Sequence, residues 1–162
     1  HFDAFLAKHP NTRLFIETGR YTVGKSGVYV TKVIDKKVSC GVNYAILKNT
    51  FNGFVRPSMG VMVGKYNDDP IAIEPMFTCK DAFQIVPLKD ADTPTEKVTL
   101  VGNLCTAADY IAEDIELPRL EADDIIVITN AGAYAAVVTP MQFSTHTKPA
   151  ELFLRTDGTI LF

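Results

Sequence analysis

Short runs of β-branched and aromatic residues recur along this chain, and a turn signal ends nearly every one of them. The strongest of these runs span residues 28–34, 98–101 and 125–129. Near the end of the chain, Asp157-Gly158 between two further apolar runs is a strong signal for a β-hairpin. Because strand patterns greatly outnumber helix patterns, we expect a mainly β fold. The expected architecture is an antiparallel, Greek-key-like β-barrel with one or two short helices.

The remaining segments divide between a few helices and further strands. Helix patterns cover residues 2–9, 107–113 and 135–141. Additional strand patterns cover residues 13–17, 38–47, 60–65 and 71–87. We expect Lys36 and Lys37 to form a solvated turn and Cys40 to pack in the core. Lys80 lies in a strand-like stretch, and we interpret it as a solvated lysine rather than one that forms a Schiff base.

The composition bounds the class of protein. A chain of 162 residues with 47% hydrophobic and 22% charged residues is long enough for one domain with a sizeable core. A formal net charge of −3 predicts binding neither to nucleic acid nor to a membrane surface. Cys40, Cys79 and Cys105 are widely spaced and form no Cys-x-x-Cys pair, which favours a reducing compartment over a disulfide framework or a metal site. We therefore expect a cytoplasmic protein without a bound metal.

Cys105 stands at the end of an apolar run and next to a helix-start signal. Thr106 and Asp109 have the spacing of a capping box, so the pattern predicts a helix that begins just after the cysteine. The positive end of a helix dipole favours a thiolate, which makes Cys105 a candidate reactive thiol. Two alternatives stay open. In the first, Cys105 would only be a small residue that closes a strand. In the second, Thr106 and Asp109 would be structural caps without a chemical role.

Three motifs together resemble one enzyme family. Residues 102–109 read Gly-Asn-Leu-Cys-Thr-Ala-Ala-Asp, which is similar to a Gly-Pro-x-Cys-x-x-x-Asp segment. Residues 124–134 end in Gly-Ala-Tyr, and residues 17–20 read Glu-Thr-Gly-Arg where the family has Glu-Pro-Gly-Arg. The family is the fold-type III pyridoxal-phosphate amino-acid decarboxylases, which include diaminopimelate and eukaryotic ornithine decarboxylases. The three motifs occur in the family's order.

The resemblance implies a role for each matching residue. Glu17 would contact the pyridine nitrogen of pyridoxal 5'-phosphate, while Gly19, Arg20 and Tyr134 would hold its phosphate. Cys105 would donate a proton in the active site of the partner subunit of a homodimer. The candidate substrate contacts are Arg20, Thr106 and Asp109.

The resemblance also implies a division of the chain and of the protein. Residues 1–20 would be the remnant of an N-terminal (β/α)8 barrel that carries the Schiff-base lysine, and residues 21–162 the C-terminal β-barrel domain. We therefore expect a fragment of a longer enzyme that is inactive alone. The alternatives are a non-catalytic regulator with the same fold and an autonomous β-barrel interaction module.

The expected substrate is an amino acid or amino-acid derivative whose α-carboxylate is removed. Thr106 stands where the family's ornithine enzymes have Asp and its diaminopimelate enzymes have Glu. Leu47 or Lys48 and Phe51 stand where diaminopimelate enzymes are expected to have an arginine and a tyrosine. These differences favour a modified or carrier-linked amino acid of the siderophore or antibiotic type. Diaminopimelate, in lysine biosynthesis, is the alternative.

Overall fold

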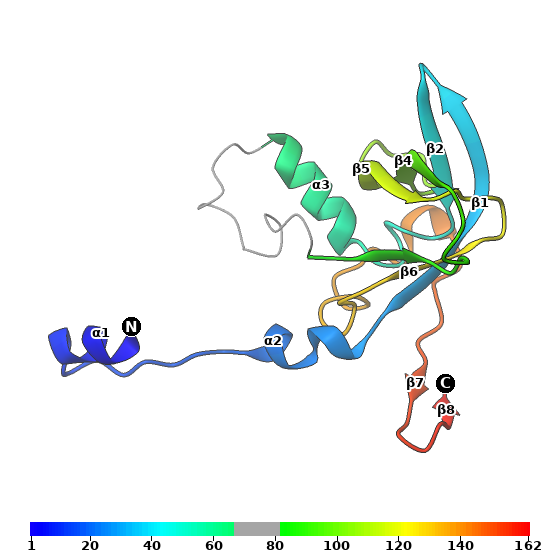
Figure 1. Cartoon of the computed structure of the whole chain (residues 1–162). Coiled ribbons are helices and arrows are strands. Elements are labelled where there is room, and N and C mark those ends of the chain that lie inside the picture. The colour runs from blue at the N-terminus through cyan, green and yellow to red at the C-terminus, as the bar shows by residue number, and fades with distance from the viewer. Residues whose placement is uncertain (67–81) are drawn as a thin grey trace.

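The fold is built on one six-stranded sheet that curls toward a barrel (Figure 1). We describe residues 1–66 and 82–162 of a computed structural model. In spatial order the strands are β3 (Ile85–Pro87), β6 (Ile125–Ile128), β1 (Tyr29–Ser39), β2 (Val42–Leu47), β4 (Thr95–Val101) and β5 (Tyr110–Pro118). Every neighbouring pair is antiparallel except β2 and β4, which are parallel. The predicted mainly β architecture is confirmed, with one parallel pair inside it.

The core lies on the inner face of this curled sheet. Side chains alternate along β1, so that Tyr29, Thr31 and Val33 are buried while Val30 faces outward. Residues from the other long strands complete a single cluster, including Leu47, Leu100, Ile111, Ile126 and Ile128. Phe54 closes one side of it, with its ring centroid 5.8 Å from that of Tyr29 and 5.3 Å from that of Phe83. Burying each such side chain contributes roughly 1.5–3 kcal/mol.

The β1–β2 hairpin turns later than the sequence pattern predicted. Lys36 and Lys37 lie within β1, and the turn is made by Cys40 and Gly41, which both have positive φ angles, 49° and 79°. Two consecutive residues in the left-handed region suit the right-handed twist of the paired strands. The prediction that Cys40 packs in the core was therefore wrong, because the turn exposes its side chain.

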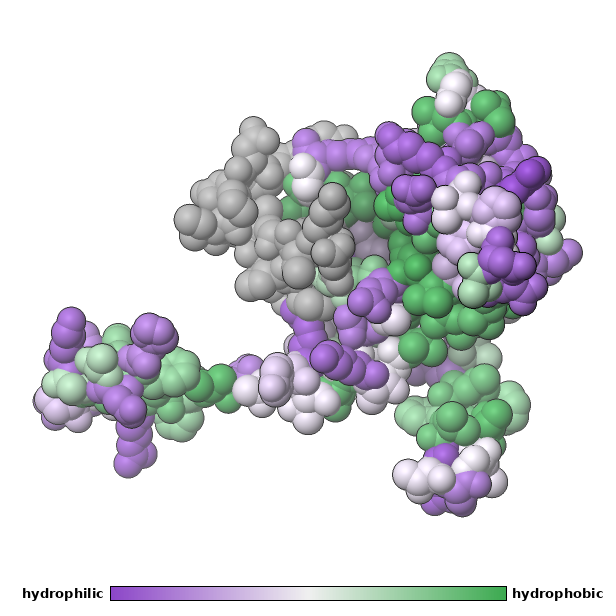
Figure 2. All heavy atoms as spheres, in the orientation of Figure 1, coloured by the Kyte–Doolittle hydropathy of each residue, from purple (hydrophilic) through white to green (hydrophobic). Residues whose placement is uncertain are grey.

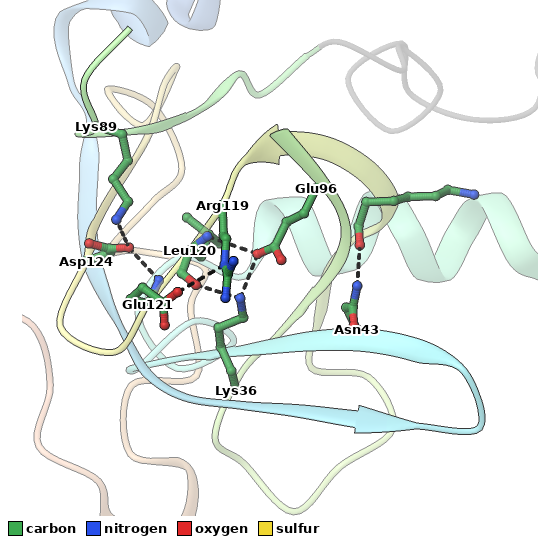
Figure 3. Close-up of polar contacts among 9 residues, drawn as sticks. Lys36, Asn43, Lys89, Glu96, Arg119, Leu120, Glu121 and Asp124 are labelled. Carbon is green, nitrogen blue, oxygen red and sulfur yellow. Dashed lines mark hydrogen bonds and ion pairs between the residues drawn. The ribbon is translucent and has the colours of Figure 1, made fainter. Parts of the chain in front are cut away.

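Lys36 points inward from β1 and forms part of a polar cluster (Figure 3). Its Nζ lies 2.7 Å from Oε1 of Glu96 and also donates to the carbonyl of Leu120. The same Glu96 oxygen accepts the Leu120 amide at 2.9 Å. This cluster ties the loop after β5 to β1 and β4, while nearby Lys89 pairs with Asp124 at 2.6 Å.

Helix α3 (Arg56–Tyr66) replaces the strand that the sequence predicted at residues 60–65. The two β-branched valines had favoured a strand there, but the segment packs as a helix against β5. Lys65 holds the two elements together, with Nζ 2.6 Å from Oε1 of Glu113 and 4.4 Å from the ring centroid of Tyr110. Contacts with a remote strand therefore decided the conformation of this segment.

The two ends of the chain lie away from the sheet (Figure 1). At the start, α1 (Phe2–Lys8) confirms the predicted short helix, whereas residues 13–17 form no strand and lead into α2 (Gly19–Val23) and the 3-10 turn η1 (Gly24–Ser26). At the end, β7 (Phe153–Leu154) and β8 (Ile160–Leu161) confirm the hairpin around Asp157-Gly158. Figure 2 shows hydrophobic residues gathered on this hairpin.

Residues 135–141 form turns rather than the predicted helix, and a 3-10 turn η2 (Phe143–Thr145) follows them. Cys79, Lys80 and most of the strand pattern at residues 71–87 lie outside the described residues. Within the described residues, no helix has the length and apolar character needed to cross a membrane.

Candidate active site

The loop after β6 docks on the turns that precede β1. The amide of Gly132 donates to the carbonyl of Gly24, and the amide of Ala131 donates to the carbonyl of Gly27, both at 2.9 Å. A side chain at Gly132 would collide with the Val23 carbonyl, so only glycine fits this approach. Two segments that are about a hundred residues apart in sequence are thereby joined by backbone contacts.

This docking brings Arg20 and Tyr134 together. The guanidinium carbon of Arg20 lies 4.9 Å from the ring centroid of Tyr134, within the range of a cation–π contact. Tyr134 has a φ angle of 57°, in the left-handed region where a bulky residue is strained. Such strain persists only where the surroundings hold the residue in place, and it concentrates at functional sites.

Arg56, which the sequence analysis missed, lies at the same ring. Its guanidinium carbon is 5.9 Å from the Tyr134 centroid, and the residue is 6% exposed. A substrate-binding arginine was expected at residues 47–51, where the chain has none, whereas Arg56 stands at the start of α3. The sequence did hold one signal for the position of this arginine. Arg56 precedes Pro57, and proline is common in the first turn of a helix. Two guanidinium groups therefore lie at the Tyr134 ring, and guanidinium groups bind phosphate and carboxylate anions well.

The other predicted cofactor residues lie on the approach to α2. Gly19 is the first residue of α2, and nothing lies within 4 Å of the position that a Cβ atom would take there. Glu17 is exposed and stands in the irregular segment that precedes this helix. The structure thus joins Arg20 and Tyr134 by direct contact and leaves Glu17 at the surface of the chain. Within residues 1–66 and 82–162, no cluster of His, Cys, Asp or Glu could hold a metal ion.

Cys105 lies in a loop between β4 and β5, and its side chain is exposed. The predicted helix at residues 107–113 is absent, because Tyr110 and the residues after it pair with β4 as strand β5. The hydroxyl of Thr106 accepts the Ala108 amide at 3.2 Å, which is a local turn and not a helix cap. No helix therefore begins beside the Cys105 thiol, and the expected activation of the thiol by a helix dipole was wrong.

Asp109 is buried and is satisfied by donors of the chain itself. Its carboxylate accepts the Thr50 hydroxyl at 2.5 Å and the amides of Phe51 and Leu104 at 3.1 Å each. Only 2% of the residue is exposed. These contacts favour the structural interpretation of Asp109 over a substrate contact. Its charge also acts on Tyr29, because burial and the Asp109 carboxylate both raise the pKa of the Tyr29 hydroxyl.

The segment between β2 and α3 connects the Cys105 loop with the Arg20–Tyr134 pair. At one end it holds Asp109 through Thr50 and Phe51. At the other end, the Val55 amide donates to the Thr139 hydroxyl at 3.1 Å, and Arg56 reaches Tyr134. The Cys105 loop and the Arg20–Tyr134 pair are therefore linked through residues 50–56.

Comparison with known proteins shows which family the sequence matches. The family described as "Pyridoxal-dependent decarboxylase, C-terminal sheet domain" matches residues 20–132. The L-glutamyl-[BtrI acyl-carrier protein] decarboxylase of Niallia circulans is 29% identical over 150 residues, which are 91% of this chain and 32% of that protein. The diaminopimelate decarboxylase of Methanothermobacter thermautotrophicus is 31% identical over 140 residues, 86% of this chain and 28% of that protein. The 2-[(L-alanin-3-ylcarbamoyl)methyl]-2-hydroxybutanedioate decarboxylase of Staphylococcus aureus is 32% identical over 146 residues, 87% of this chain and 33% of that protein.

Solved structures agree in fold. Diaminopimelate decarboxylase from M. jannaschi superimposes with a TM-score of 0.67 at 21% identity, over 87% of this chain and 27% of that one. The Helicobacter pylori diaminopimelate decarboxylase complexed with L-lysine has a TM-score of 0.62 at 25% identity, over 88% of this chain and 29% of that one. The chain spans between 28% and 33% of the length of the three relatives named above. It belongs to the family of pyridoxal-dependent decarboxylases, as their C-terminal sheet domain.

Proposed function

We propose that this chain is the C-terminal part of a pyridoxal-phosphate-dependent enzyme that removes the α-carboxylate of an amino acid or amino-acid derivative. The observation that carries the proposal is the Arg20–Tyr134 contact, which the docking of Gly132 on Gly24 builds from two separate motifs. The relatives named above are all decarboxylases, in support of the reaction type.

The residues at the Tyr134 ring fit the cofactor's phosphate. Arg20 and Arg56 place two permanent positive charges at one ring, and a phosphate is a doubly charged anion that guanidinium groups recognise well. We assign phosphate contacts to Arg20, Gly19 and Tyr134, and the pyridine nitrogen to Glu17. Pyridoxal phosphate, when bound, serves as the electron sink for loss of carbon dioxide. The lysine that would hold it is not assigned to this chain.

Cys105 is proposed as the proton donor to the carbon that loses the carboxylate. Its exposed side chain, on a loop whose neighbours are held in place, suits a group that acts on a molecule outside this chain. We propose that this molecule is the substrate in the partner subunit of a homodimer. Arg20 and Tyr134 then serve the cofactor of their own subunit.

The substrate class follows from Thr106 and from residues 47–51. No arginine stands at residues 47–51, where diaminopimelate enzymes are expected to have one for a second carboxylate. Thr106 still offers no charge to a distal ammonium group. We favour a modified or carrier-linked amino acid, and the names of the N. circulans and S. aureus relatives describe substrates of that kind. Diaminopimelate, which the name of the M. thermautotrophicus relative gives as its substrate, is the second candidate.

Residues 1–20 are proposed to belong to an N-terminal (β/α)8 barrel that supplies the cofactor lysine. Phe15 and Ile16 are 81% and 59% exposed, so this segment presents apolar side chains that a larger domain would cover. Residues 21–162 are the β-barrel domain in this division. We propose that the whole enzyme acts in the cytoplasm.

The full-length gene product tests the proposal. We expect it to bind pyridoxal phosphate, with an absorbance band that borohydride abolishes, and to release carbon dioxide from one of the two substrate classes. Cys105→Ala should keep the band and lower kcat by about 100-fold or more. Cys40→Ala, at the exposed β1–β2 turn, is the matched control and should match the wild type. A protein with no cofactor band would contradict the proposal and leave a regulator or an interaction module.

A further inference from the structure

Asp109 closes the loop that carries Cys105 on both sides of the cysteine. Its side chain binds the amide of Leu104, the residue before Cys105, at 3.1 Å. Its own amide donates to the carbonyl of Thr106, the residue after Cys105, at 3.3 Å. One residue therefore holds the backbone immediately before and immediately after the thiol.

The same carboxylate fastens this loop to a second segment. Its other oxygen accepts the Thr50 hydroxyl at 2.5 Å and the Phe51 amide at 3.1 Å. Asn103 adds a parallel contact, because its side-chain oxygen accepts the Asn49 amide at 3.0 Å. Residues 49–51 continue within a few residues to Arg56, which starts α3. Asp109 thus binds both the loop that carries Cys105 and the segment that leads to Arg56.

The surroundings of Asp109 allow little alternative geometry. The carboxylate is almost fully buried, and each of its oxygens is already bonded. Gly102 packs so closely on this carboxylate and on the Thr50 hydroxyl that any side chain there would overlap them. A buried and fully bonded network of this kind has one arrangement, and replacing a member leaves the others without partners.

We propose that Asp109 is a positioning residue, which fixes the loop that carries the Cys105 thiol on residues 49–51 and thereby on the sheet. Asp109 itself touches neither substrate nor cofactor in this assignment. The inference rests on the proposed role of Cys105 as proton donor and adds the group that holds this donor in place.

Asp109→Asn in the full-length, cofactor-loaded protein is the test. The amide keeps the size of the carboxyl group but presents a donor on one side, where it faces either Leu104 or the Thr50–Phe51 pair. We expect the Leu104 and Phe51 amides to exchange hydrogen about tenfold faster or more. We also expect kcat to fall by about tenfold or more with KM within about twofold, because the binding groups stay in place. Should Asp109→Asn fail to fold, Thr50→Val removes a single donor and should show smaller changes of the same kind.

A double mutant separates positioning from general stability. In a Cys105→Ala background, Asp109→Asn should cause no further loss of kcat, because the group that it positions is gone. Asp124→Asn is the matched control, since Asp124 accepts the Glu121 amide and pairs with Lys89 in another part of the fold, and its kcat should stay unchanged.

Three outcomes would overturn the inference: unchanged amide exchange at Leu104 and Phe51, faster exchange with an unchanged kcat, or an equal loss of kcat in the Cys105→Ala background. If the wild type decarboxylates neither substrate class, the proposed function fails first, and the exchange data still show whether Asp109 holds the loop.

Discussion

Gly132 is the position at which a single methyl group should separate the segments that carry Arg20 and Tyr134. In Gly132→Ala, the new Cβ would lie 2.8 Å from Oγ of Ser26, 3.0 Å from the Gly24 carbonyl oxygen and closer still to that of Val23. Two of these three atoms belong to the backbone, so the methyl group cannot be accommodated by a side-chain rotation. The loop after β6 must move away from the turns before β1.

The cost follows from the contacts that this movement breaks. Overpacking at a closely fitted site costs about 1–3 kcal/mol. The two backbone hydrogen bonds of 2.9 Å that join Ala131 and Gly132 to the turns contribute about 1 kcal/mol each. We therefore expect Gly132→Ala to lower the free energy of unfolding by about 3–5 kcal/mol.

Urea denaturation of the 162-residue chain measures this change. The chain has six tyrosines and no tryptophan, so tyrosine fluorescence and circular dichroism are the probes. Gly64→Ala in α3 is the matched control, because nothing lies within 4 Å of its added Cβ. That variant should be more stable by up to about 1 kcal/mol, since alanine favours a helix. Equal stabilities of the two variants would refute the argument from close packing.

Two further predictions concern the core and the polar cluster of Lys36. Phe54→Ala removes a ring that is 1% exposed and contacts Tyr29 and Phe83, and it should cost about 3–5 kcal/mol in the same urea titration; a cost below about 1 kcal/mol would contradict the packing. For Glu96, burial opposes ionisation, but hydrogen bonds from Lys36 and the Leu120 amide prevail and lower its pKa below the ordinary 4.5. A lowered folded pKa means that the stabilisation is present above the unfolded pKa and is lost as the pH falls through the folded one. The stability difference between wild type and Glu96→Gln should therefore be largest near neutral pH and shrink below about pH 4.5, and a difference that does not change with pH would contradict this.

Local sequence decided the features whose cause is local. The alternating run that starts β1, the buried run of β6 and the Asp157-Gly158 hairpin were all predictable, because side-chain alternation and turn chemistry act over a few residues. The motifs around Arg20, Cys105 and Tyr134 also identified the family from the sequence alone.

Tertiary structure decided the segments whose neighbours are remote in sequence. Residues 107–113 have helix formers but complete the ladder of β4, and residues 60–65 have a strand pattern but pack on β5 as a helix. Local propensity contributes a few tenths of a kcal/mol per residue, which burial and strand pairing outweigh.

The site itself also depended on the tertiary fold. Arg56 and Tyr134 meet across 78 positions of the sequence (134 − 56), and Asp109 meets Thr50 across 59. No spacing rule in the sequence connects such pairs. Only the folded chain therefore shows that Arg56 and Arg20 contact the same tyrosine ring and that Asp109 holds the Cys105 loop. The sequence by itself determined which chemical groups the protein carries. The fold determined which of them meet, because contact between distant segments requires the whole sheet to be formed.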